Sequence, residues 1–318
     1  MTKFVRGEVP KTRPFQFADL AELLLLVGDY DELSHGDLEA VITQGVPDSD
    51  PDEKSDNTDH AVEVNAREQR YIKGCFNHLT YRVNAFDDIY PFEMDQEVLV
   101  KKASISQQNY VYLFLLGCSR LGSFNDLKFR QVCAHLFVEI AAQALKKLMS
   151  ANSKIWIFDA NSDDRRSHFT TNLQESLRIL AREMSERHDE MVVIQQEPSG
   201  DGGLDIVGIH QFPDKGRGYL VFLGQCAAQK DGWPKKTLEP RRLNTIFNFS
   251  HQPYNLNFIP VLYRNITGAW VNEVYTADCV IVDRLRIVKT IYQNGEGLSL
   301  KVFQKVKSCV DKMASFSG

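Results

Sequence analysis

The 318-residue sequence lacks the short motifs by which several enzyme classes are recognised. Its six cysteines form no CxxC pair and its eight histidines form no HExxH, so zinc chemistry has little support and reduced cytosolic thiols are the simplest interpretation. There is no P-loop ending in GKS or GKT, no GxGxxG and no GxSxG, which argues against phosphate-cradling loops and serine hydrolases. The glycine-rich stretch SGDGG (199–203) is better interpreted as a tight turn before a strand.

Long apolar runs and a strong net charge are also missing. The run LLLLV at 23–27 is too short to span a bilayer, and the first residues contain no apolar signal region, so we expect a cytoplasmic protein without membrane attachment. The formal charge of −5 argues against nucleic-acid binding over the whole surface, although a local basic face remains compatible with it. With 43% hydrophobic residues, the chain can build one elaborated domain or two.

The first 125 residues have helical periodicity, and we expect an all-helical N-terminal region over 1–125. Residues 15–45 predict a helical hairpin whose second helix is capped by Ser34, and residues 66–86 and 111–121 predict two further helices. The segment 47–60 has six acids, one lysine and two prolines, which is typical of a loop. A second interpretation of this acidic loop, as a contact for a basic partner, stays open.

From residue 126 to residue 318 the pattern changes to mixed helices and strands. Helices are predicted over 126–150, 170–190 and 298–315. Short β-branched or aromatic runs predict three consecutive strands, MVVI, LDIVGI and YLVFLG, within 191–227, and further strands within 256–264 and 277–288. We therefore expect an α/β domain with a mixed central sheet flanked by helices.

Polar residues stand at the ends of two of these strands. Asp205 lies in the second strand of the 191–227 stretch, and Gln225 and Cys226 end the third. A carboxylate, an amide oxygen and the backbone carbonyl of Cys226 are oxygen donors of the kind that hard cations bind. The stretch predicts a site for Mg²⁺ or Mn²⁺, formed by Asp205, Gln225 and Cys226.

These residues carry a resemblance to a known superfamily. The segment GGLDIVG, followed after a glycine turn by YLVFLGQCA, resembles the core of the PD-(D/E)xK, or restriction-endonuclease-like, nucleases. The resemblance implies that Asp205 is the first acid and Gln225 the second, in the Gln variant of the motif. Ala227 stands where the lysine of the motif is expected, and Lys235 or Lys236 would replace it. A helix acid completes the site in many members, and both Glu139 and Glu175 qualify by their order along the chain.

The window 228–249 is the most basic part of the chain near this site. Its cations are interleaved with Trp233 and Phe247, a pattern that suits contact with a phosphate backbone and an unstacked base. The alternative is an ordinary charged helix start with a packing tryptophan. The residues predicted to contact nucleic acid are Lys230, Trp233, Lys235, Lys236, Arg241 and Arg242.

The resemblance implies a metal-dependent nuclease that hydrolyses phosphodiester bonds in DNA. It further implies an effector subunit of a bacterial anti-phage defence or restriction system, controlled by an ATPase or sensor partner, with homo-oligomerisation left open. A second hypothesis is a catalytically inactive nuclease-like module that acts as a DNA-binding or scaffold subunit. Gln225 and Ala227 favour this alternative, whereas Asp205 favours the enzyme.

Overall fold

A computed structural model describes residues 3–44, 58–214, 216–228, 232–237 and 239–316. The chain forms two compact units. Unit 1 comprises Met1–Cys133, Val261–Val271 and Phe303–Gly318, and unit 2 comprises Ala134–Pro260 and Asn272–Val302. Two helices, α5 (Leu127–Leu148) and α10 (Leu300–Ala314), contain residues of both units. No helix of the described residues is both long enough and apolar enough to cross a membrane.

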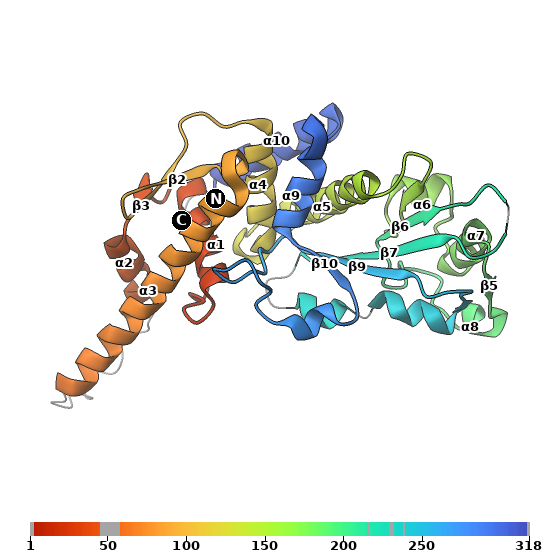
Figure 1. Ribbon diagram of the computed structural model, residues 1–318, viewed down its shortest axis with the longest axis horizontal. Helices are drawn as coiled ribbons and strands as arrows, with labels where there is room; N and C mark the ends of the chain where they lie inside the picture. The colour runs from red at the N-terminus through yellow and green to blue at the C-terminus, as the bar shows by residue number, and fades with distance from the viewer. Residues whose placement is uncertain (1–2, 45–57, 215, 229–231, 238, 317–318) are drawn as a thin grey trace. The chain divides into compact units, whose positions relative to one another are not determined.

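Unit 1 is built mainly from helices, as its periodicity predicts (Figure 1). They are α1 (Pro14–Leu26), α2 (His35–Gln44), α3 (Thr58–Phe86) and α4 (Gln107–Ser119). The two helices predicted within 15–45 are confirmed as α1 and α2, and the hydroxyl of Ser34 accepts a hydrogen bond of 3.3 Å from the amide of Asp37, as expected of a capping residue. Residues 47–57 of the acidic loop predicted over 47–60 lie outside the described residues, and the last three residues, 58–60, begin helix α3.

The expectation that residues 1–125 are all-helical is wrong, because unit 1 also contains a small antiparallel sheet. Its strands are β1 (Glu32–Leu33), β2 (Phe92–Asp95) and β3 (Val98–Lys101), in the order β1-β3-β2. The hairpin between β2 and β3 has a two-residue loop in which Gln96 has a positive φ of 55°. Phe92 and Leu99 are buried, so the hairpin is held by its apolar side chains.

Unit 2 contains the predicted mixed sheet, with five strands in the order β10-β9-β7-β6-β4 (Figure 1). The strands are β4 (Lys154–Ile157), β6 (Ile206–His210), β7 (Leu220–Cys226), β9 (Tyr254–Phe258) and β10 (Val280–Val282). β6 pairs antiparallel with β4 and with β7, and the pairs β7–β9 and β9–β10 are parallel. Ile206 is paired with Gly224 in the antiparallel pair of β6 and β7. Asp205, directly before β6, and Gln225 of β7 are therefore the residues next to this pair at the same end of the sheet.

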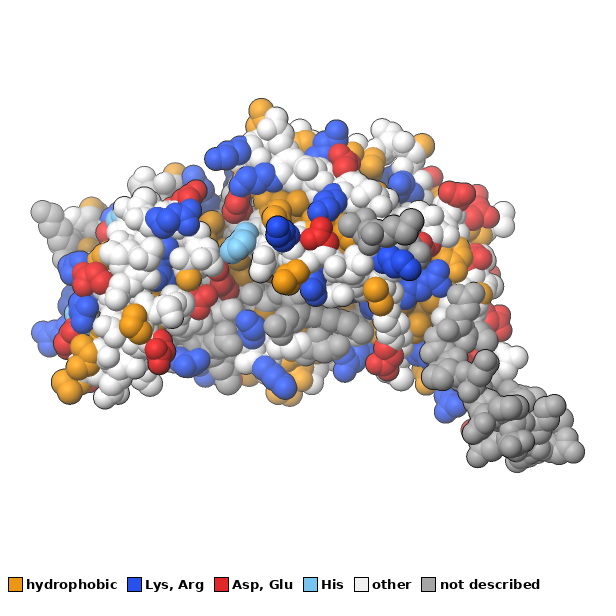
Figure 2. Space-filling view, turned by 180° about the vertical axis from the view of Figure 1, so that it is seen from behind, with side chains coloured by type: hydrophobic (Ala, Val, Ile, Leu, Met, Phe, Trp, Pro, Cys, Tyr) orange, Lys and Arg blue, Asp and Glu red, His pale blue; other side chains and the backbone are white. Residues whose placement is uncertain are grey.

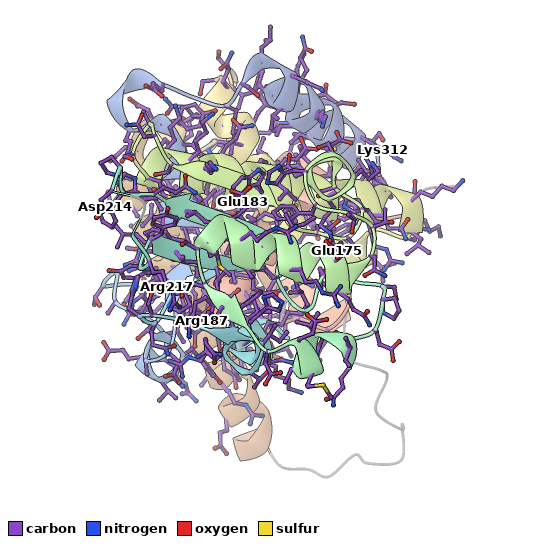
Figure 3. All side chains as sticks on the ribbon, turned by 90° about the vertical axis from the view of Figure 1, so that its right-hand side faces the viewer. Glu175, Glu183, Arg187, Asp214, Arg217 and Lys312 are labelled. Carbon is purple, nitrogen blue, oxygen red and sulfur yellow. The ribbon has the colours of Figure 1, made fainter. Side chains whose placement is uncertain are left out.

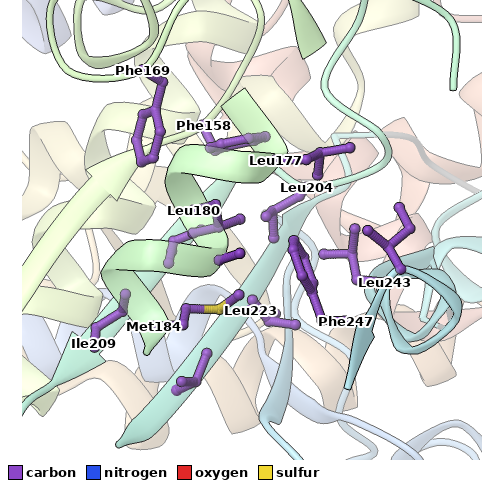
Figure 4. Packing of buried hydrophobic residues seen from close by; sticks show 14 of the residues in the cluster. Phe158, Phe169, Leu177, Leu180, Met184, Leu204, Ile209, Leu223, Leu243 and Phe247 are labelled. Carbon is purple, nitrogen blue, oxygen red and sulfur yellow. The ribbon is translucent and has the colours of Figure 1, made fainter. Parts of the chain in front are cut away.

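Helices cover both faces of this sheet. Leu177, Leu180 and Met184 of α7 (Leu173–Met184) pack into a buried cluster with Val207 and Leu223 (Figure 4). On the opposite face, Gly208 leaves room for α5, because a Cβ atom there would lie 2.6 Å from the sulfur of Met149 and 3.1 Å from Leu145. The expectation of a mixed sheet flanked by helices is confirmed.

One of the strands expected in unit 2 is wrong, and one strand was not predicted. MVVI forms the short helix α8 (Glu190–Ile194) instead of a strand, because the carboxylate of Asp189 caps its first turn by accepting from the amides of Met191 and Val192. The strand that completes the antiparallel part of the sheet is β4, which the periodicity did not indicate. The remaining helices and strands of unit 2 are α6 (Asp163–Ser167), β5 (Arg187–His188), β8 (Phe247–Asn248) and α9 (Arg284–Tyr292).

Candidate metal centre

Three carboxylates converge at one end of the unit 2 sheet. Asp159 follows β4, Asp201 lies in the glycine-rich turn and Asp205 directly precedes β6. One oxygen atom from each of the three lies within 4.8 Å of the others. Three carboxylate oxygens at this separation form a donor set suited to a hard divalent cation.

Strand pairing and a glycine turn bring these acids together. The amides of Phe158 and Asp159 both donate to the carbonyl oxygen of Asp205, at 2.7 and 3.3 Å, so the pairing of β4 with β6 extends to the acids themselves. Gly200, Gly202 and Gly203 have positive φ values of 92°, 67° and 80°. This left-handed backbone is easy for glycine, and it turns the chain so that Asp201 comes close to Asp205.

The Asp205 carboxylate is buried, with 7% of the residue exposed, and is held by the next strand. Its Oδ2 accepts a hydrogen bond of 2.6 Å from the backbone amide of Cys226. Burial raises the pKa of Asp205 from 3.8 to about 7, and the nearby Asp201 and Asp159 add to the rise. The amide of Cys226 and the charge of Lys236 lower this pKa, but burial dominates. Proton and cation would therefore compete for Asp205 near neutral pH.

A buried arginine is hydrogen-bonded to the backbone next to two of the three acids. Arg165 has no exposed surface, and its Nη1 donates to the carbonyl oxygens of Phe158 and Gly200, at 3.0 and 3.2 Å. These carbonyls belong to the residues directly before Asp159 and Asp201, so one guanidinium ties the two acid-bearing loops together. Burial lowers the pKa of Arg165, and the charges of Asp201 and Asp159 offset part of that effect.

The strand-end residues predicted to bind metal lie beside Asp205, at the end of β7. Gln225 is 4% exposed and its Oε1 is a buried acceptor without a hydrogen-bond partner in the described part of the chain. Cys226 contacts Asp205 through its amide nitrogen, and the expectation that its carbonyl oxygen faces a metal stays a prediction. Burial, followed by the charge of Asp205, raises the pKa of the Cys226 thiol well above its usual range, so the thiol stays protonated. Ala227 is buried, and its amide donates to the carbonyl of Phe258.

Neither of the two candidate helix acids belongs to the group of three carboxylates. Glu175 stands in the first turn of α7 and pairs with Arg178 at 3.2 Å and with Arg182 at 3.7 Å. Figure 3 shows Glu175 and Glu183 on this helix. Glu139 is half-buried on α5. Another α5 residue, His135, lies near the acids, with its Nδ1 3.8 Å from Oδ1 of Asp159.

Among the described residues that were predicted to contact nucleic acid, Lys236 is the one whose charge acts on Asp205. It lowers the pKa of both Asp205 and Cys226, and it is half-buried, whereas Lys235 is exposed. Arg242 is exposed, and Arg241 pairs with Asp278 at 2.8 Å. Lys230 lies outside the described residues. On the face drawn in Figure 2, basic side chains are interspersed with acidic ones and form no continuous stripe.

Trp233 does not have the exposure that stacking on a base requires. Only 2% of it is exposed, and its ring packs edge-on against Tyr275 with centroids 5.6 Å apart. The expectation that it contacts an unstacked base is therefore replaced by the packing interpretation, in which Trp233 anchors the 3₁₀ helix η3 (Trp233–Lys236) that carries Lys236.

Sequence reasoning found Asp205 but missed Asp159 and Asp201. A signal for each was present. Asp159 directly follows the apolar run KIWIF, and Asp201 is flanked by glycines in the turn SGDGG. Comparison with known proteins adds no assignment: no family model, no curated protein and no solved structure matches this chain.

Proposed function

We propose that unit 2 is a metal-dependent nuclease domain that hydrolyses phosphodiester bonds in DNA. The observation that carries the proposal is the convergence of Asp159, Asp201 and Asp205 within 4.8 Å. The donor set consists only of carboxylate oxygens, which fits Mg²⁺ or Mn²⁺ better than zinc. When bound, such a cation lowers the pKa of a coordinated water and offsets charge on the phosphate.

The residues of the chain have distinct tasks in this proposal. Asp159, Asp201 and Asp205 hold the cation, and the amide of Cys226 fixes the orientation of the Asp205 carboxylate. Arg165 keeps the two loops that carry Asp159 and Asp201 at a fixed separation. Lys236 takes the place of the lysine that the motif has at Ala227, because its charge already acts on Asp205.

The restriction-endonuclease-like assignment is supported by the order of the strands. An acid at the start of β6 and a glutamine near the end of the neighbouring β7 are the placements that the resemblance implies. From the same resemblance we propose a cytoplasmic effector subunit of a bacterial defence or restriction system, with DNA as substrate and an ATPase or sensor protein as partner.

The test is a cleavage assay on plasmid and linear DNA with Mg²⁺ or Mn²⁺, with Asp159→Asn, Asp201→Asn and Asp205→Asn measured beside the wild type. We expect cutting by the wild type and a loss of about 100-fold or more in each variant. Asp163→Asn is the matched control, because the Asp163 side chain is 93% exposed and lies outside the three-acid group. Cutting that survives in all three variants would remove the site assignment.

A second function, a catalytically inactive DNA-binding or scaffold module, is favoured by one observation. Ala227 is buried and its backbone is engaged with β9, so the lysine of the motif is absent and its position is closed. If DNA binds with a dissociation constant unchanged by Asp205→Asn and no metal supports cutting, this second function holds.

A further inference from the structure

A polar groove in unit 1 lies between α2, α3 and the β2–β3 hairpin. Its volume is about 540 Å³, within the usual range of roughly 300–1,000 Å³ for small-molecule sites. One face of α3 supplies most of its lining, and the remainder comes from His35 of α2, Met94 of β2 and the hairpin tip at Gln96 and Glu97. The lining residues that carry the argument are His35, Gln69, Arg70, Lys73, Asn77 and Glu97.

Several polar side chains of this groove have no partner in the described part of the chain. Arg70 and Lys73 form no ion pair or hydrogen bond with any residue that the structure describes. The amides of Gln69 and Asn77 likewise form no hydrogen bond with a described residue, so the groove presents donors and acceptors that are free for a ligand. Thr80 is an exception, because its hydroxyl donates to the carbonyl oxygen of Phe76 at 3.0 Å. Elsewhere in unit 1, Lys11 is paired with Glu68 at 3.5 Å and Lys312 with Asp126 at 2.8 Å.

A second cleft of the same volume, in unit 2, provides the contrast. There Arg241 is paired with Asp278 at 2.8 Å, and the amide of Asn244 donates to Gln252 at 2.9 Å. The same cleft also contains Oδ1 of Asn255, a buried acceptor without a hydrogen-bond partner in the described part of the chain. The unit 1 groove differs in that its two cations, Arg70 and Lys73, have no partner among the described residues and would gain one from an anionic ligand.

The arrangement of charge specifies the class of ligand. Arg70 and Lys73 are three residues apart on α3, so their side chains lie on adjacent turns of one helix face and can bind oxygens of a single phosphate. Glu97 of the hairpin also lines the groove, so the net charge of Arg70, Lys73 and Glu97 together is +1. This balance suits a phosphate monoester that also carries a hydrogen-bond donor better than it suits a polyanion.

The remaining walls suit a flat polar ring. Phe76 and Met94 line the groove, and the ring of His35 packs on Phe76 with centroids 4.1 Å apart. Amide side chains such as Gln69 and Asn77 pair with the donor and acceptor edge of a heterocycle, as side-chain amides do with bases. We propose that this groove is a binding site for a nucleoside monophosphate or a closely similar phosphorylated heterocycle. The site is separate from the three acids of unit 2 and does not depend on the proposed nuclease activity.

The experiment is calorimetric titration of the full chain with adenosine, guanosine, cytidine and uridine 5′-monophosphates, and with inorganic phosphate and adenosine as partial ligands. We expect at least one monophosphate to bind with a dissociation constant below about 1 mM, and adenosine to bind more weakly because it lacks the phosphate. Arg70→Ala and Lys73→Ala should each weaken binding roughly 10-fold to 100-fold.

Two controls separate the possible outcomes. Arg67→Ala removes an exposed cation from the same helix that does not line the groove, so binding should stay within about twofold of the wild type. Asp205→Asn should leave binding unchanged, which separates this site from the proposed nuclease site. The proposal is overturned if no monophosphate binds, if Arg67→Ala weakens binding as much as Arg70→Ala, or if only an oligonucleotide binds.

Discussion

Arg165 and Gly200 are 35 positions apart in the sequence and are joined by a hydrogen bond of 3.2 Å from Nη1 to the carbonyl oxygen. The same nitrogen donates to Phe158, and Nε donates to Thr170 at 3.0 Å. A guanidinium with several donors in fixed directions is well suited to hold three backbone segments at once. The separation of Asp159 from Asp201 therefore depends on a residue that is not itself one of the three acids.

We predict that Arg165→Lys weakens Mn²⁺ binding about 10-fold to 100-fold, because a lysine cannot reach the carbonyls of Phe158, Thr170 and Gly200 together. Calorimetric titration with Mn²⁺ measures this change, and circular dichroism checks that the variant is folded. Arg166→Lys is the control, because the Arg166 side chain is 54% exposed. Unaltered Mn²⁺ affinity in a folded Arg165→Lys protein would contradict the positioning role.

The raised pKa of Asp205 predicts a pH-dependent stability in the absence of metal. Between pH 3.8 and about 7 the folded protein keeps this carboxyl protonated, whereas the unfolded chain releases the proton. The contribution of Asp205 to the unfolding free energy is therefore present below pH 3.8 and is lost as the pH rises to about 7. Its full size is on the order of 4 kcal/mol, from the difference between the two pKa values.

Urea denaturation in EDTA at several pH values between 4 and 8 measures this contribution. Asp205→Asn keeps an acceptor for the amide of Cys226 but cannot ionise, so its unfolding free energy should fall less than that of the wild type across this window. Parallel curves for the two proteins would show that Asp205 is already ionised at low pH. Mn²⁺ affinity of the wild type should rise up to about pH 7, because the metal displaces the proton.

Asp205 was assigned from the sequence, whereas Asp159 and Asp201 were missed because their local signals do not show that they meet Asp205. The acid stands between a glycine turn and an apolar run, both of which are local signals. Asp159 and Asp201 join it only because β4 pairs with β6 and Arg165 ties their loops, and these are contacts between distant positions. The strand β4 has four residues, KIWI, which is too short for alternation to separate it from its surroundings.

Local composition also misled where a distant or specific contact decided the outcome. MVVI has the β-branched content of a strand. It forms a helical turn because Asp189 caps it and because Val193 is its one buried side chain, whereas a strand in the sheet would bury more of the segment. Trp233 lies in a basic window typical of a binding surface, yet its ring is buried against Tyr275, far along the chain. The mixed sheet, by contrast, could be predicted, because β6, β7 and β9 each carry a clear apolar pattern.

A buried charge network in unit 1 leads to a separate prediction on stability. Arg82 has no exposed surface, and its Nη1 lies 2.8 Å from Asp19 and 2.8 Å from Glu22. Tyr90 and Tyr112 also donate to Glu22, at 2.6 and 2.8 Å. Arg82→Met would leave two carboxylates buried without their cation, and we expect a loss of about 3–5 kcal/mol in the unfolding free energy.

Two comparison variants show whether the loss of unfolding free energy in Arg82→Met is specific to the buried charge network. Tyr90→Phe removes one hydrogen bond to Glu22 and should cost about 1.5–3 kcal/mol. Lys11→Met removes the partly exposed pair with Glu68 and should cost less than about 1 kcal/mol. Urea denaturation followed by circular dichroism measures all three variants. If Arg82→Met were no more destabilised than Lys11→Met, the network would not depend on its cation.

Lys236 and Lys235 provide the sharpest test of how the absent motif lysine is replaced. Of these two lysines, Lys236 is the one that lowers the pKa of Asp205, so we expect Lys236→Ala to lower the rate of DNA cleavage about 100-fold and Lys235→Ala to change it less than about threefold. Removal of this cation should also raise the pKa of Asp205 and shift the pH–rate profile to higher pH. Ala227→Lys should restore nothing in the Lys236→Ala protein, because Ala227 is 1% exposed and a lysine there would be buried in the sheet. Equal losses in Lys235→Ala and Lys236→Ala would show that the replacement is not Lys236, whereas a rescue by Ala227→Lys would show only that position 227 can accept a lysine.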